Sequence, residues 1–315
     1  MKKVFLLAVA VATMTACEKP VYDEFSDNSE KSENSEVAKP TKKFTFTLKG
    51  DFSSEWKLDV IGDFPAGNAG EAAAREVTRG YLAADGRDMT DVWVLDYMNG
   101  HLVQQVHQSD NTAEDFGKPM MQLAYGSHHV YFVASRGAGP DMNVVEHRLT
   151  WEKVSDTFWA DYAVEVVATS NGNRAVTLER VATKLRLTFT DAIPDNAATI
   201  NITPAIWYKG LDYLTGEPCA VAENQTITIN IPSTSIGQTG VQASMFSIST
   251  ATEWTADVTI SSKTSGDAVL GTATLTAVPL KANRVSDYSG PLFGSEGSMT
   301  LSLNTVWDES LVKTW

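Results

Sequence analysis

The segment Lys43-Phe44-Thr45-Phe46-Thr47-Leu48 decides the fold, because its apolar residues alternate strictly with polar ones. A similar run, Lys184-Leu185-Arg186-Leu187-Thr188-Phe189, lies in the second half of the chain. Successive side chains of a β-strand point to opposite faces of a sheet. Each run therefore predicts a strand with one buried face and one face in water.

Further strands follow from the same alternation and from short apolar runs. The alternating segments are residues 227–231, 258–260, 269–275 and 299–303. Residues 92–95 and 130–134 are almost continuously apolar, which predicts central strands. Turn pairs such as Asn99-Gly100 and Ser265-Gly266 separate such runs. Residues 69–78 have the composition of a helix, with an irregular loop as the alternative. We therefore expect an all-β chain of antiparallel β-sandwiches.

The length of the chain predicts two domains. Its 315 residues are more than one hydrophobic core usually serves. The turn at Asn171-Gly172 separates an apolar segment at 162–167 from the next at 181–185. We expect the first sandwich at residues 44–175 and the second at 176–315. The halves share a strand rhythm, without a repeat of the length found in solenoids or propellers.

The N-terminus predicts export and a lipid anchor. Lys2 and Lys3 precede an apolar run at residues 4–12, and Thr15-Ala16-Cys17 resembles the lipobox of bacterial lipoproteins. The run is shorter than the roughly 20 residues that span a bilayer. We expect a signal peptide at 1–16 and acyl chains, palmitate among them, on Cys17, with an ordinary secretory signal as the alternative. The polar residues up to 43 complete a flexible tether at 17–43.

Charge and cysteine content exclude several classes of protein. The formal net charge of −14 argues against a nucleic-acid partner, whose phosphates are bound by clustered Lys and Arg. Cys219 is the second of two cysteines, so a lipidated Cys17 leaves no disulfide framework. His128 and His129 are adjacent on an expected strand and point to opposite faces, which disfavours a shared metal. We expect no metal site.

Catalytic motifs are weak. Gly137-Ala138-Gly139 lacks the third glycine and the helix of a phosphate-binding loop. Asp85, Asp88 and Asp91 are spaced by three, unlike a calcium-binding loop. No nucleophile elbow of the form Gly-x-Ser-x-Gly is present. Carboxylate pairs for glycoside cleavage stay open, because sequence spacing does not give their separation in space. The expectation is a protein without catalytic residues or cofactors.

Four segments resemble the fimbrial anchor and fimbrillin superfamily of type V pili. The first is Met89-Thr90-Asp91-Val92-Trp93-Val94-Leu95-Asp96-Tyr97, followed by Asn99-Gly100. The others are residues 125–134, residues 182–194 and residues 278–293. The resemblance spans nearly the whole mature chain. It implies two transthyretin-like β-sandwiches in a lipoprotein of the outer membrane and fimbrium of anaerobic Gram-negative bacteria.

The resemblance also implies how such subunits assemble. In polymerising members an arginine-specific protease cuts near the first strand, the lipidated piece leaves, and a neighbour's strand fills the groove. Anchor subunits keep their lipid. No arginine lies between Cys17 and Arg75, so a cut in the tether or just after the first strand is impossible here. An anchor or minor subunit is favoured. The alternative is a major pilin cut after Arg75 or Arg79.

The C-terminal strand and the tryptophans complete the expectations. The candidate docking residues are Met299, Leu301, Leu303, Trp307 and Trp315, with burial in the core as the alternative for the two tryptophans. The internal tryptophans, which indicate core or sheet-face positions, are Trp93, Trp151, Trp159, Trp207 and Trp254. Exposed as a platform, they would suit a glycan-binding surface adhesin. The expected partners are fimbrial subunits, the outer membrane through Cys17, and a host glycan or protein.

Overall fold

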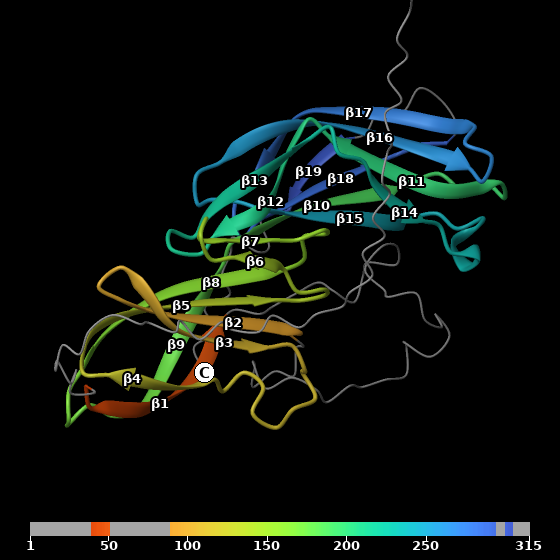
Figure 1. The fold of residues 1–315 in the computed structure, drawn as a ribbon. Helices are drawn as coiled ribbons and strands as arrows, with labels where there is room; N and C mark the ends of the chain where they lie inside the picture. The colour runs from red at the N-terminus through yellow and green to blue at the C-terminus, as the bar shows by residue number, and fades with distance from the viewer. Residues whose placement is uncertain (1–38, 51–88, 294–299, 305–315) are drawn as a thin grey trace, which may run out of the picture. The chain divides into compact units, whose positions relative to one another are not determined.

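The fold is all-β. In a computed structural model of the protein, residues 39–50, 89–293 and 300–304 are described, the last five by their backbone alone. Every described element is a β-strand, apart from the 3-10 turn η2 (Ser233–Ser235) (Figure 1). The predicted fold class is confirmed. The expected helix at residues 69–78 lies outside the described residues.

The first half of the chain folds into one seven-stranded sheet that doubles back on itself. Its strands are β1 (Thr41–Gly50), β2 (Asp91–Met98), β3 (His101–Gln108), β4 (Met120–Ala124), β5 (Gly126–Ser135), β8 (Thr157–Val166) and β9 (Asn173–Arg180). They lie in the order β3-β2-β5-β8-β9-β1-β4. Two residue pairs alone, Phe158–Arg180 and Trp159–Glu179, join β8 to β9. Phe46 of β1 and Phe132 of β5 meet in one core between the two parts of the sheet.

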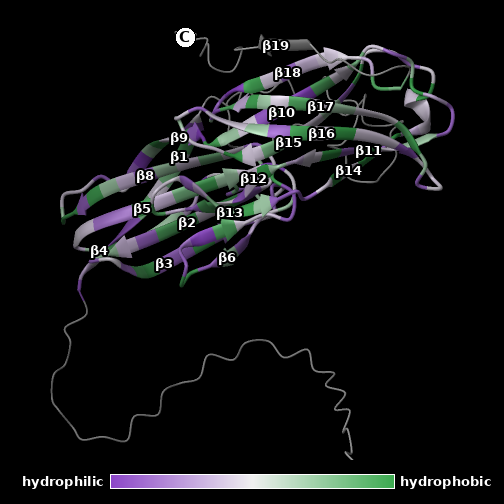
Figure 2. Ribbon diagram, turned by 90° about the horizontal axis from the view of Figure 1, so that it is seen from above, coloured by the Kyte–Doolittle hydropathy of each residue, from purple (hydrophilic) through white to green (hydrophobic). Residues whose placement is uncertain are grey.

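The second half forms two four-stranded sheets around a second core. Its strands are β10 (Ala182–Phe189), β11 (Ala197–Pro204), β14 (Ile227–Asn230), β15 (Val241–Ile248), β16 (Trp254–Thr264), β17 (Val269–Leu280), β18 (Val285–Gly290) and β19 (Thr300–Asn304). The sheet orders are β15-β10-β18-β19 and β14-β11-β16-β17. Leu187 of β10 and Ile260 of β16 are both fully buried in the core between these sheets. Apolar and polar residues alternate along many strands (Figure 2).

The two halves repeat one topology. In each, the first strand pairs in parallel with a late strand, β1 with β9 and β10 with β18. Each first strand also has an antiparallel partner, β4 or β15. The order β3-β2-β5-β8 of the first half matches β14-β11-β16-β17 of the second, strand for strand along the chain. Strand β19 has no counterpart among the described strands of the first half.

Two inserted hairpins join the halves. One is β6 (Asp141–Asn143) with β7 (Arg148–Thr150), and the other is β12 (Ile206–Asp212) with β13 (Glu217–Glu223). They pair with each other through β7 and β12, in the order β13-β12-β7-β6 (Figure 1). The described residues belong to one compact unit. The expected boundary near 175 stays a prediction.

A third hydrophobic cluster fills the junction beneath these hairpins. It contains Leu95, Val133, Leu211 and Phe246, drawn from both halves. Val94 and Phe132 point the other way, into the core of the first half. Strands β2 and β5 are therefore buried on both faces, as their apolar runs predict.

Polar contacts also hold the junction. The hydroxyl groups of Tyr97 and Tyr213 are 2.9 Å apart, and the Trp159 indole donates a hydrogen bond to the Tyr213 carbonyl at 2.8 Å. The Arg180 guanidinium donates to the Asp156 carboxylate at 2.7 Å and to the Asn283 amide oxygen at 2.7 Å. Both side chains of the Arg180–Asp156 pair are 2% exposed. Removing one partner of such a pair leaves a buried charge uncompensated, which is strongly destabilising.

Candidate assembly site

The C-terminal strand is the part of the expected docking site that the structure describes. Leu301 and Leu303 lie in β19, where their backbones pair with Tyr288 and Ser286 of β18. The remaining candidate residues, Cys17, Arg75, Arg79, Met299, Trp307 and Trp315, lie outside the described residues. Lipidation, proteolysis and docking at those positions stay predictions.

Strand β19 lies at the edge of its sheet. It pairs antiparallel with β18 over five residue pairs, from Ser289–Thr300 to Val285–Asn304. Within the described part of the chain β18 is its sole partner strand. An edge strand leaves one row of backbone N–H and C=O groups free to pair with another chain. Its partner strand β18 contributes the buried side chains of Val285 and Tyr288 to the interior.

Asp191, about 100 residues earlier in the sequence, binds the backbone of residues 292–293, the last described residues before β19. The Asp191 carboxylate accepts hydrogen bonds from the backbone N–H groups of Leu292, at 3.0 Å, and Phe293, at 2.5 Å. Gly271 packs directly against the Leu292 carbonyl oxygen, in a space that a β-carbon would fill. The Phe293 ring packs edge-on against Phe189, with centroids 6.1 Å apart. We call Asp191, Gly271 and the backbone of 292–293 the C-terminal clasp.

The first strand is an interior strand of its sheet, next to the edge strand β4. Strand β1 pairs with β4 on one side and β9 on the other. Phe44 and Phe46 are fully buried, and Leu48 is 3% exposed. Phe46 packs edge-on against Phe132, with ring centroids 5.1 Å apart. Cleavage after Arg75 or Arg79 would cut the chain between β1 and β2, so any release of the N-terminal piece requires extraction of this buried strand.

The adjacent histidines face opposite sides of β5, as predicted. His128 is buried, with Nδ1 2.8 Å from the Asp96 carboxylate and Nε2 2.9 Å from the Ala124 carbonyl oxygen. His129 is exposed and lies beside Asp161. Burial raises the pKa of Asp96 more than the hydrogen bond from His128 lowers it. Because the pair sits inside the sandwich, its geometry suits clamping β2 to β5 rather than chemistry on a bound molecule.

A second histidine–carboxylate pair lies at the start of β2. His107 Nε2 is 2.7 Å from the Asp91 carboxylate, and the His107 ring stacks on Trp93 at 3.8 Å between centroids. Burial raises the pKa of Asp91, against the lowering effect of His107. No cluster of three or more candidate metal ligands occurs among the described residues. Nor does any helix within them have the length and apolarity to span a membrane.

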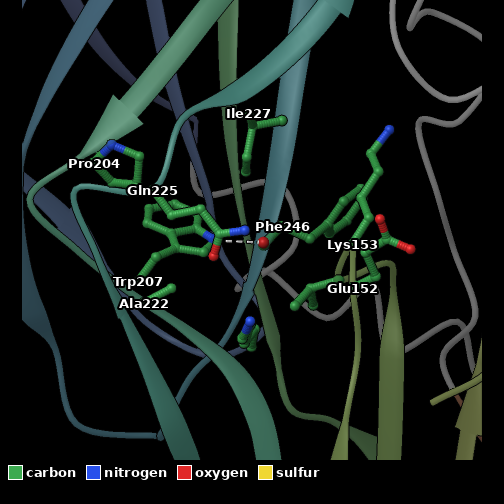
Figure 3. A pocket seen from close by; sticks show the side chains of 10 residues that line it. Glu152, Lys153, Pro204, Trp207, Ala222, Gln225, Ile227 and Phe246 are labelled. Carbon is green, nitrogen blue, oxygen red and sulfur yellow. Dashed lines mark hydrogen bonds between the residues drawn. The ribbon is translucent and has the colours of Figure 1, made fainter. Parts of the chain in front are cut away.

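The tryptophans of the described ranges form no exposed platform. Trp151 and Trp207 are buried, and Trp93, Trp159 and Trp254 are half-buried. Figure 3 shows Trp207 in the wall of a pocket that Lys153, Gln225 and Phe246 also line. Its indole N–H donates to the Phe246 carbonyl at 2.5 Å, and the side chain is 3% exposed. The ring therefore offers no open face on which a sugar could stack.

Sequence comparison finds no match, whereas structural comparison finds several. No protein-family model and no curated protein matches the chain. A candidate adhesin from Bacteroides ovatus is 12% identical over 86% of this chain and 96% of its own, with a TM-score of 0.48. The tip fimbrial protein Mfa3 of Porphyromonas gingivalis, truncated at its C-terminus, is 12% identical over 69% of this chain and 94% of its own, with a TM-score of 0.39. A candidate polysaccharide-binding protein from Bacteroides thetaiotaomicron is 10% identical over 83% of this chain and 98% of its own, with a TM-score of 0.45.

Proposed function

We propose that this protein is a non-catalytic lipoprotein of the cell surface, an anchor or minor subunit of a fimbria that joins its neighbours by strand addition. Its lipid on Cys17 would hold the chain to the outer membrane, and its partners would be other subunits of the same fibre. The proposal combines three observations: the lipobox-like N-terminus, the four segments that resemble fimbrial subunits, and the arrangement of the strands.

The observation that carries strand addition is the position of β19. It is a short C-terminal strand at the edge of its sheet, with one described partner, β18. In the same sheet β10 and β18 each pair with two strands, and the opposite edge strand, β15, buries Val241, Ala243 and Met245 in the core. Main-chain hydrogen bonds supply most of the affinity when an extended segment joins such an edge. The C-terminal clasp fixes residues 292–293, which precede β19 in the chain.

The burial of β1 supports an anchor over a polymerising pilin. Removing the first strand would expose Phe44, Phe46 and Leu48, which are almost completely buried. Each such side chain contributes about 1.5–3 kcal/mol through burial, or roughly 5–9 kcal/mol for the three. That sum is comparable to the whole stability of many domains, at about 5–15 kcal/mol. A subunit that keeps β1 avoids this cost and keeps its lipid as well.

Two variants in the producing bacterium test the proposal. Cys17→Ser removes the lipid site, and a chain ending at residue 293 removes β19. We expect the wild-type protein in the outer-membrane and fimbrial fractions, the serine variant released from the membrane, and the shortened chain in the membrane but absent from purified fimbriae. Fimbrial incorporation of the shortened chain, or wild-type protein confined to the cytoplasm, would refute the proposal.

A further inference from the structure

The structural repeat shows a strand position in the first half that no described strand fills. In the second half β18 lies between β10 and β19. Its counterpart β9 pairs with β1 through Asn173–Leu178 on one side. On the other side, β8 reaches β9 through Glu179 and Arg180 alone. Among the described strands, nothing pairs with the outer edge of β9 between residues 173 and 178.

Side-chain burial shows the same difference between the halves. Strand β17 of the second half turns Ala273, Leu275 and Val278 inward, and all three are buried. Its counterpart β8 also buries Phe158, Ala160 and Val166, but Tyr162 and Val164 between them are only partly buried. The Tyr162 ring reaches Phe46 of β1, at 6.1 Å between centroids. Among the described residues, apolar surface of Tyr162 and Val164 therefore stays exposed along the part of β8 that does not pair with β9.

We propose that the outer edge of β9 accepts an antiparallel strand from the neighbouring fimbrial subunit. The occupant has the chemistry of Thr300–Asn304, in which leucines alternate with Ser, Thr and Asn. This inference rests on the proposed function and names the acceptor edge for strand addition. It leaves β1 in place, because the incoming strand joins the sheet beyond β9 instead of replacing β1.

The repeat also sets the register of the added strand. Both parallel ladders contain six residue pairs, Thr45–Gly50 with Asn173–Leu178 and Lys184–Phe189 with Val285–Gly290. Matching them end to end places Val176 where Tyr288 lies and Ala175 where Asp287 lies. In the second half Tyr288 faces Leu301 and Asp287 faces Ser302. An equivalent strand on β9 would set its leucine opposite buried Val176, over Tyr162 and Val164, and its serine opposite exposed Ala175.

Disulfide trapping with a synthetic peptide tests both site and register. The probe is this chain's segment 298–306 with cysteine in place of Ser302, activated as a pyridyl disulfide. The protein is the mature chain with Cys17→Ser and Cys219→Ala, carrying Ala175→Cys. Matched controls carry Val269→Cys, on the exposed edge strand β17, or Asp287→Cys, at the native place of β19. Release of thiopyridone gives the rate of disulfide formation.

The A175C variant is expected to react about tenfold or more faster than V269C, because a bound partner has an effective concentration of millimolar order. Equal rates in A175C and V269C would overturn the inference, as would fast reaction at D287C alone, which would mean exchange at the native β19 position. If the trapping experiment gives either of these two results but the protein keeps its lipid and enters fimbriae, the proposed function stands and only the acceptor site on β9 is rejected. Absence from fimbriae would instead defeat the proposed function itself.

Discussion

Asp191→Ala should loosen the C-terminal segment while leaving the rest of the protein intact. The Asp191 carboxylate accepts the N–H groups of Leu292 and Phe293, just before the chain leaves for β19. Alanine cannot accept these bonds. The two N–H groups would then have to find water or remain unsatisfied, and opening of the segment would become easier.

The expected change in the free energy of local opening follows from the number and kind of hydrogen bonds that the substitution removes. A hydrogen bond to a charged group contributes about 1.5–3 kcal/mol, and two N–H groups share this carboxylate. Asp191 is half-buried, so solvent screening reduces the total. We expect local opening to become easier by about 2 kcal/mol, a factor of roughly 30 in the equilibrium.

Hydrogen exchange of backbone amides measures this opening directly. Exchange at residues 285–293 should accelerate about 5- to 30-fold in D191A, with β5 in the first half unchanged. The matched control is Asp195→Ala, which removes an exposed carboxylate from the same loop. If D191A and D195A exchange equally slowly at Leu292 and Phe293, the clasp does not hold the segment.

Three further predictions concern the core, the junction and the free thiol. Phe46→Ala should lower the free energy of unfolding by about 3–5 kcal/mol in urea denaturation, because it leaves a cavity in the first core; a loss below 1 kcal/mol would contradict the packing of β1. Tyr213→Phe should cost about 1–3 kcal/mol by leaving the Tyr97 hydroxyl without its partner, whereas an unchanged midpoint would mean that the contact adds nothing. Burial raises the pKa of the Cys219 thiol, so at pH 8 a smaller fraction of this thiol is thiolate in the folded protein than in the unfolded chain. Iodoacetamide should therefore react more slowly with the folded protein than with the urea-unfolded chain, and equal rates would refute this prediction.

Local alternation predicted the strands that bury one face against a core. The runs around Phe46, Leu187 and Ile229 each became a strand, and the C-terminal alternation became β19. The apolar run 92–95 correctly indicated a central strand. In each case the pattern within a few residues carries the information, since a side chain's face is fixed by its position in the strand.

Pairings between distant segments could not be predicted. Strands β6 and β7 have three residues each, too few to show a period. Strand β13 is Glu-Pro-Cys-Ala-Val-Ala-Glu, with weak alternation, although it helps form the sheet that joins the halves. The edge position of β19 and the open edge of β9 depend on parallel pairings between segments far apart in the sequence. The Asp191 clasp is likewise invisible in the sequence, where an Asp before a proline-containing turn looks like any loop acid.

Intact mass and N-terminal sequencing of the protein from its native outer-membrane and fimbrial fractions test the central claim most directly. A retained first strand and lipid predict a chain that begins at an acylated Cys17 and continues without a break through Arg75 and Arg79. A chain that begins at Glu76 or Gly80, without lipid, would contradict the account, because β1 would have been removed and the protein would be a polymerising pilin.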